Sequence, residues 1–108
     1  MPVEGESAGQ REVTVVTLCG SMRFGAELER LAAELTLTGH VVLAPVALAA
    51  ATELDADQRE LLGRIHLQKV AMADEVVVVN VGGHVGESTR REVEHARSLG
   101  ITVRFLET

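Results

Sequence analysis

The sequence alternates between short β-branched runs and longer segments with helical periodicity, and this alternation restricts the possible folds more than any other feature. The apolar runs cover residues 13–19, 41–44, 76–79 and 101–106. The periodic segments between them cover residues 24–35, 55–73 and 87–99, and Gly39 and Gly100 are expected to stop the first and the third. The first three runs are almost continuously apolar, which is typical of strands that are covered on both faces.

Each connection between consecutive runs is long enough to hold a helix, so the order predicts a parallel sheet with helices on both faces. Right-handed crossovers leave few topologies, of which we expect a four-stranded sheet with order 2-1-3-4. Residues 12–108 then form one α/β domain, preceded by a polar lead-in over residues 1–11 that we expect to be disordered. Ligands bind such sheets beyond the carboxyl ends of the strands, where the strand order reverses. The loops after the first three strands therefore define the candidate site.

The second helix has an identifiable start. Asp55 and Gln58 have the spacing of a capping box at its N-terminus. We expect the helix to pack against the sheet through Leu61, Leu62, Ile65 and Met72.

The composition excludes several classes of protein. The formal net charge of −6 argues against a polymeric nucleic acid or a membrane surface as the partner. Phe24 and Phe105 are the only aromatic residues, and Phe24 alone lies near the candidate loops. The single cysteine, Cys19, cannot form an internal disulfide or a CxxC site. No apolar stretch approaches the ~18 residues of a membrane span, and the N-terminus has no secretory pattern, so we expect a soluble cytoplasmic protein.

The loop after the first strand contains Gly20, Ser21 and Arg23. Glycine allows the backbone to approach a ligand closely, and a helix start offers free N–H groups to an anion. The Arg23 guanidinium could grip a phosphate or carboxylate. The loop fits neither the GxGxxG nor the Walker A spacing. It is equally consistent with a plain strand-to-helix turn that Ser21 caps.

The loop after the third strand is glycine-rich and runs from Asn80 to the start of the third helix. It contains Gly86, followed by Ser88 and Thr89, which open the helix. These residues predict a second anion-receptive helix start at the same edge of the sheet.

Glu92 has two possible roles. With Thr89 it matches the capping box [ST]-x-x-[DE], in which case it merely caps the helix. It also shares a helical face with Ala96 and Leu99, and this face should turn toward the sheet. A carboxylate on the inner face beside the crevice is suited to catalysis.

Metal binding is not predicted. Glu92 and His95 have Glu-x-x-His spacing, but the second copy and the helical bundle that di-metal sites require are missing. His66 borders an apolar helix face and fits a packing residue, while Cys19 fits a small buried hydrophobe with no identifiable histidine partner. His40 and His84 are either surface residues or ligand contacts. We expect no cofactor.

Three segments in matching order resemble the nucleoside 2-deoxyribosyltransferase superfamily, including its nucleotide N-glycosidase branch. They are Thr17–Phe24, residues 67–69 through Ala73-Asp74 and the valine run, and Gly86–Ala96 ending in Leu99-Gly100. The resemblance spans residues 13–106. It implies a three-layer, flavodoxin-like or Rossmann-like fold, an oligomer, and cleavage of the N-glycosidic bond of nucleosides or their 5′-monophosphates.

The resemblance also implies roles for individual residues. Glu92 matches the glutamate that attacks C1′ of the sugar. Gly20, Ser21 and Arg23 match substrate contacts in the first loop, and the loop containing Gly86, Ser88 and Thr89 matches the one that holds the sugar or its 5′-phosphate. Many members have an aspartate eight residues before Asp74, where this chain has His66, whose imidazolium could protonate the leaving base.

Three functions are consistent with these observations. The first is hydrolysis of an N-glycosidic bond, or transfer of the deoxyribosyl group to another base, through Glu92, by a homodimer or higher homo-oligomer acting on a nucleoside or nucleotide. The second is a non-catalytic nucleotide-binding module, which His66 in place of aspartate favours. The third is a structural domain without a ligand, which leaves the two glycine loops unexplained.

Overall fold

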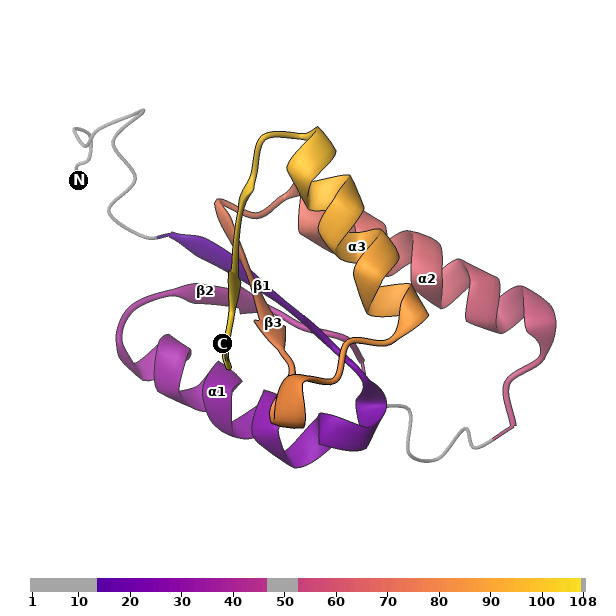
Figure 1. Cartoon of the computed structure of the whole chain (residues 1–108), viewed down its shortest axis with the longest axis horizontal. Coiled ribbons are helices and arrows are strands. Elements are labelled where there is room, and N and C mark those ends of the chain that lie inside the picture. The colour runs from indigo at the N-terminus through magenta and orange to yellow at the C-terminus, as the bar shows by residue number, and fades with distance from the viewer. Residues whose placement is uncertain (1–13, 47–52, 108) are drawn as a thin grey trace, which may run out of the picture.

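The expected strands and helices form in the computed structural model, which describes residues 14–46 and 53–107 (Figure 1). The elements are β1 (Val15–Gly20), α1 (Gly25–Leu37), β2 (Val41–Leu43), α2 (Ala56–Ala71), β3 (Glu75–Val79), α3 (Glu87–Ser98) and β4 (Thr102–Phe105), with short 3-10 turns η1 (Met22–Phe24) and η2 (Val81–Gly83). The predicted lead-in over residues 1–11 lies outside the described residues.

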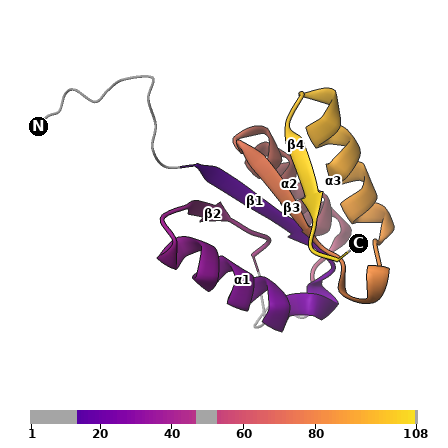
Figure 2. The ribbon, with the colours of Figure 1, turned by 60° about the vertical axis from the view of Figure 1, so that its left-hand side comes forward.

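The four strands form one parallel sheet in the order β2-β1-β3-β4, as the sequence predicts. Val16 of β1 lies beside Val42 of β2 on one side and Glu75 of β3 on the other. The strand order reverses between β1 and β3, the two central strands (Figure 2).

Helices cover both faces of the sheet and make a three-layer domain (Figures 1 and 2). On one face, Phe24 and Leu28 pack on alternate residues of the central strands, namely Val16, Leu18, Val77 and Val79. On the other face, α2 and α3 contribute Val70, Val93 and Ala96, which pack with Cys19, Val76 and Val78. Burial of each such valine or leucine stabilises the fold by about 1.5–3 kcal/mol, so the two clusters fix the helices on the sheet.

The strand β2 is less buried than its apolar sequence predicts. It has three residues at the edge of the sheet, and the side chain of Val41 is 47% exposed. The expectation that β2 is covered on both faces is therefore wrong, because β2 is an edge strand that packs mainly against α1.

Helix α2 packs through only part of the set that was expected. Leu61, Ile65 and Met72 are exposed, whereas Leu62 is half-buried on the same face as buried His66 and Val70. The inner face of α2 is therefore the one that carries His66, which is a buried residue as its apolar neighbours predicted. Asp55 and Gln58 do form the predicted capping box. None of the helices in the described part of the chain is both long and apolar enough to cross a membrane.

Candidate functional site

A cavity of about 640 Å³ lies beyond the carboxyl ends of the central strands. Its wall comes from the loops after β1 and β2, one face of α2, and the segment from His84 to Glu92. The predicted site residues on this wall are Gly20, Ser21, Arg23, His66, Gly86, Ser88, Thr89 and Glu92. The cavity occupies the place where parallel sheets of this kind bind ligands.

Asn80 does not line the cavity. Its side chain is buried, donates from Nδ2 to the Glu107 carbonyl at 2.8 Å, and accepts from the Glu107 N–H at Oδ1, also at 2.8 Å. These bonds tie the C-terminal segment to the end of β3. A role for Asn80 in substrate binding stays a prediction.

The loop after β1 combines a cap with part of the cavity wall. The Ser21 hydroxyl accepts a hydrogen bond from the Arg23 N–H at 3.3 Å, as a cap of the short turn η1. Arg23 is exposed and lines the cavity. Within residues 14–46 and 53–107, its side chain forms no ion pair. The sequence was consistent with either a capped turn or a ligand-binding loop. The Ser21 cap is present, and the same residues also line the cavity.

Phe24 belongs to the hydrophobic core. It is 9% exposed, and its ring forms a T-shaped contact with the His84 ring, with centroids 5.9 Å apart. His84, whose role the sequence left open, lines the cavity, whereas His40 contacts the end of α1 through the Leu35 carbonyl. Any ring contact to a ligand in this cavity therefore comes from histidine rather than from Phe24.

Helix α3 begins earlier than the capping box in its sequence implies. Gly86 occupies the N-cap position without a side-chain cap, and Thr89 is 4% exposed within the first turn. The interpretation of Glu92 as a cap partner of Thr89 is therefore wrong. Glu92 lies one turn further on, where it faces inward beside buried Val93 and Ala96. Leu99, expected on the same inner face, is half exposed.

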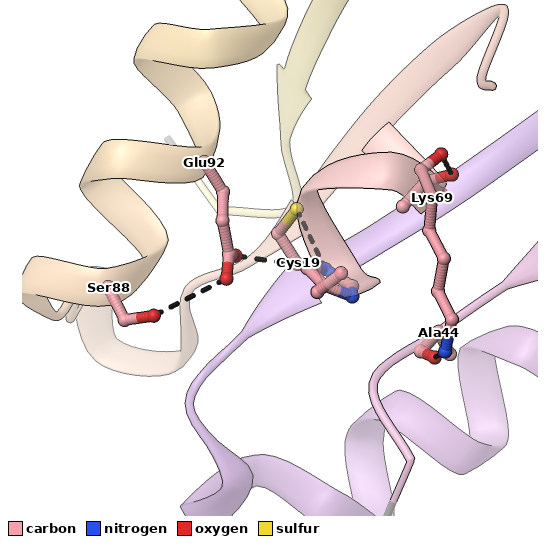
Figure 3. Close-up of polar contacts among 7 residues, drawn as sticks. Cys19, Ala44, Lys69, Ser88 and Glu92 are labelled. Carbon is pink, nitrogen blue, oxygen red and sulfur yellow. Dashed lines mark hydrogen bonds and ion pairs between the residues drawn. The ribbon is translucent and has the colours of Figure 1, made fainter. Parts of the chain in front are cut away.

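The Glu92 carboxylate is largely removed from water. The side chain is 13% exposed, and Ser88 Oγ donates to Oε2 at 3.4 Å (Figure 3). Burial raises the pKa of Glu92, and hydrogen bonds from Cys19 and Ser88 partly oppose that rise. The N-terminus of α3, one turn away, favours the ionised carboxylate. Desolvation acts in the opposite direction here.

His66 lies close to both Cys19 and Glu92. Its Nε2 is 3.5 Å from Cys19 Sγ and 3.8 Å from Glu92 Oε1. Burial, followed by the charge of Lys69, lowers the pKa of His66 to about 4. The imidazole is therefore neutral at pH 7.

Cys19 has the partners that the sequence did not reveal. Its Sγ, His66 Nε2 and a Glu92 carboxylate oxygen all lie within 4.8 Å of one another. Burial raises the pKa of the Cys19 thiol, and the neighbouring Glu92 charge raises it further. The three residues come from β1, α2 and α3, so no local spacing could have predicted their contact.

Two cationic residues of the cavity wall, Arg59 and Lys69, were missed at the sequence level. Lys69 Nζ donates to the Ala44 carbonyl at 2.7 Å and thereby holds the end of β2 against α2 (Figure 3). Both residues share a face with His66, at spacings of seven and three residues. Helical periodicity extended from His66 could have found them.

Comparison with known proteins gives a structural match. No family model matches the sequence, and no curated protein does. Among solved structures, the chain is similar to a 2-deoxyribosyltransferase from the psychrotolerant bacterium Bacillus psychrosaccharolyticus, which is described as a biocatalyst for nucleoside synthesis. The TM-score is 0.65 at 17% sequence identity, over 84% of this chain and 70% of that one. The likeness confirms the fold that the sequence resemblance implies.

Proposed function

We propose that this chain cleaves the N-glycosidic bond of a nucleoside 5′-monophosphate or nucleoside, with Glu92 as the nucleophile. The observation that carries the proposal is a carboxylate that is largely desolvated yet forms part of the wall of a cavity large enough for a nucleotide. A desolvated carboxylate near the anomeric carbon stabilises an oxocarbenium-like sugar or captures it covalently. The fold shared with a deoxyribosyltransferase supports this chemistry.

The reaction would proceed by two displacements. A Glu92 oxygen attacks C1′, the C1′–N bond breaks, and its electron pair leaves with the base, which then takes up a proton. Water attacks C1′ in the second step, loses a proton and releases the carboxylate, so the configuration at C1′ is retained. A second free base in place of water gives transfer.

His66 is assigned a hydrogen-bonding role in this scheme. Because its pKa is lowered to about 4, the imidazolium form is scarce at neutral pH. A neutral imidazole N–H can still donate to the departing base or to Glu92, while the proton that the base acquires comes from water.

Base release tests the proposal directly. The protein is incubated with nucleosides and 5′-monophosphates, and free base is measured by chromatography. We expect Glu92→Gln to slow release by at least about a thousandfold, because the amide cannot act as the nucleophile. Glu94→Gln, an exposed carboxylate on the same helix, is the matched control and should retain the wild-type rate. No release by the wild type, or equal rates in the two variants, would contradict the assignment.

Arg23 and the start of α3 support a phosphate as part of the substrate. Arg23, Ser88 and Thr89 lie on the same cavity wall, and a helix start favours an anion. Arg23→Ala should weaken monophosphate binding by about 10- to 100-fold, the equivalent of a lost hydrogen bond to a charged group, and leave nucleoside binding nearly unchanged. Arg90→Ala, which removes an exposed arginine from outside the cavity wall, serves as the control. Equal losses for nucleoside and monophosphate would refute the phosphate role.

A non-catalytic nucleotide-binding module is the second candidate. The neutral His66, in the place where the resembling family has an aspartate, favours it. Calorimetry separates the two candidates, because tight nucleotide binding without base release supports the module.

We infer that the chain acts as a homodimer or a higher homo-oligomer. Leu61, Ile65 and Met72 are exposed apolar residues on or directly after α2, and Ile65 also borders the cavity. Met22 and Val46 add further exposed apolar surface to the cavity wall. Light scattering on the purified protein should give at least twice the chain mass. A monomer at micromolar concentration would contradict the inference.

A further inference from the structure

Cys19, His66 and Glu92 bring three different metal-ligating groups to one point. A thiol, an imidazole and a carboxylate converge there from β1, α2 and α3, and their donor atoms all lie within 4.8 Å of one another. None of the three groups is on the surface, since Cys19 is fully buried, His66 is 6% exposed and the Glu92 side chain is 13% exposed.

The spacing of these atoms fits a tetrahedral metal ion. With Zn–S near 2.3 Å, Zn–N near 2.0–2.1 Å and Zn–O near 2.0–2.2 Å, two tetrahedral ligands lie about 3.5 Å apart for sulfur and nitrogen and about 3.3 Å apart for nitrogen and oxygen. The observed distances are 3.5 Å from Cys19 Sγ to His66 Nε2 and 3.8 Å from that nitrogen to Glu92 Oε1. The third pair, Cys19 Sγ and a Glu92 oxygen, lies within 4.8 Å, against about 3.6 Å for tetrahedral sulfur and oxygen ligands. Rotation of the Glu92 side chain must therefore bring its carboxylate closer to His66 by about half an ångström and closer to Cys19 by up to about 1 Å.

The charges also suit a buried dication. A thiolate and a carboxylate together cancel the two positive charges of the ion, so the complex is neutral in a site where an unbalanced charge would be strongly disfavoured. A mixed sulfur, nitrogen and oxygen set favours Zn²⁺ or Co²⁺ over Mg²⁺ or Ca²⁺, which prefer oxygen alone.

The fourth coordination position is the remaining requirement. His66 and Glu92 both line the cavity, whereas Cys19 lies behind them at the end of β1. An ion held by the three side chains therefore has its open side toward the cavity, where water or an anionic ligand can complete the tetrahedron.

We propose that Cys19, His66 and Glu92 form a binding site for one Zn²⁺-type ion, with the fourth ligand supplied from the cavity. The thiol loses its proton when the ion binds, so uptake releases a proton to the solvent. This site differs from the Glu92–His95 pair, whose spacing gave no reason to expect a metal. The binding does not depend on the proposed function. If that function is right, the ion binds the Glu92 carboxylate that attacks C1′, and it therefore inhibits base release reversibly.

Cobalt binding tests the site spectroscopically. Protein freed of metal with a chelator is titrated with Co²⁺, and then with Zn²⁺ as competitor. We expect one ion per chain, a thiolate-to-cobalt charge-transfer band in the near ultraviolet, and loss of that band when Zn²⁺, the stronger binder, displaces Co²⁺. Saturation without a thiolate band, or no saturable binding, would overturn the proposal whatever the variants do.

Variants identify the ligands. Cys19→Ser should abolish the charge-transfer band and weaken Zn²⁺ binding at least tenfold, and Glu92→Gln should weaken binding but keep the band. His95→Gln is the matched control and should bind like the wild type. Circular dichroism before each titration establishes that the variants are folded. Two results would refute the ligand set. One is an unchanged charge-transfer band in Cys19→Ser, and the other is a loss of Zn²⁺ affinity in His95→Gln as large as the loss in Glu92→Gln.

Base release measured with and without Zn²⁺ separates this proposal from the proposed function. Release in chelator that Zn²⁺ suppresses supports both. Release without any metal binding refutes only the metal site, and metal binding without release in chelator refutes only the glycosidase.

Discussion

Replacement of Gly20 by alanine tests how closely the two central strands approach at the edge of the candidate site. Gly20 ends β1 and pairs with Val79 of β3. A Cβ at this position would lie 2.9 Å from the Val79 carbonyl oxygen and 3.3 Å from the Val79 Cβ. The first distance is shorter than real Cβ contacts, and the atom it meets belongs to the backbone of the neighbouring strand. Relief therefore requires the strands to separate rather than a side chain to rotate.

The expected loss follows from that contact. Overpacking of a well-packed interior costs about 1–3 kcal/mol, a substantial part of the roughly 5–15 kcal/mol that stabilises a domain of this size. With a urea m-value of about 2 kcal/mol/M, a loss of 2 kcal/mol moves the midpoint down by about 1 M.

Urea unfolding followed by circular dichroism measures this loss, with Gly63→Ala as the control. Gly63 is an exposed residue of α2 at the cavity wall, and a Cβ there meets no heavy atom within 4 Å. Alanine at that helical position should raise the stability by up to about 1 kcal/mol, because it restricts the unfolded chain without a clash. Opposite shifts of the two midpoints at a constant m-value support the steric argument. A Gly20→Ala midpoint equal to or above the wild-type value would refute it.

Three further substitutions probe contacts that hold the site in place. Asp55→Ala removes the cap of α2 and should lower the free energy of unfolding by about 1 kcal/mol in urea melts, whereas an unchanged midpoint would mean that the capping box contributes nothing. Asn80→Ala removes the two hydrogen bonds between the Asn80 side chain and the Glu107 backbone and should cost about 1–3 kcal/mol, with faster amide exchange at the C-terminus; exchange as slow as in the wild type would contradict this role. Arg104→Gln breaks an ion pair with Glu75 at the surface and should lower the free energy of unfolding by less than about 1 kcal/mol, an effect that disappears in 1 M salt. A larger loss of stability, or one that salt does not change, would contradict the interpretation as an ordinary surface pair.

The helix starts illustrate the limit of local motifs. At Asp55 the capping box read from the sequence is present. At α3 the same motif fits Thr89 and Glu92, yet the helix begins at Glu87 after Gly86. The inner face of α3 must meet the sheet through Val93, and this packing overrides the preference of one threonine for the N-cap.

The burial of helix α2 shows the same limit for hydrophobic patterning. Leucine and isoleucine at positions 61 and 65 predict the inner face, but these side chains are exposed and His66 is buried. The pattern of α2 does not distinguish a face that packs on the sheet from one that remains at the surface. The orientation of α2 brings His66 beside Cys19, a contact between residues 47 positions apart in the chain.

The sequence by itself determined the element order, the parallel sheet with order 2-1-3-4, and the edge of the sheet at which the cavity lies. These properties follow from local periodicity and from the few connections that a chain of alternating strands and helices can make. Only the tertiary structure decided which side chains meet in that cavity. The contact of Cys19 with His66 and Glu92 depends on how α2 and α3 are rotated against the sheet, and that rotation is set by packing among residues far apart in the chain.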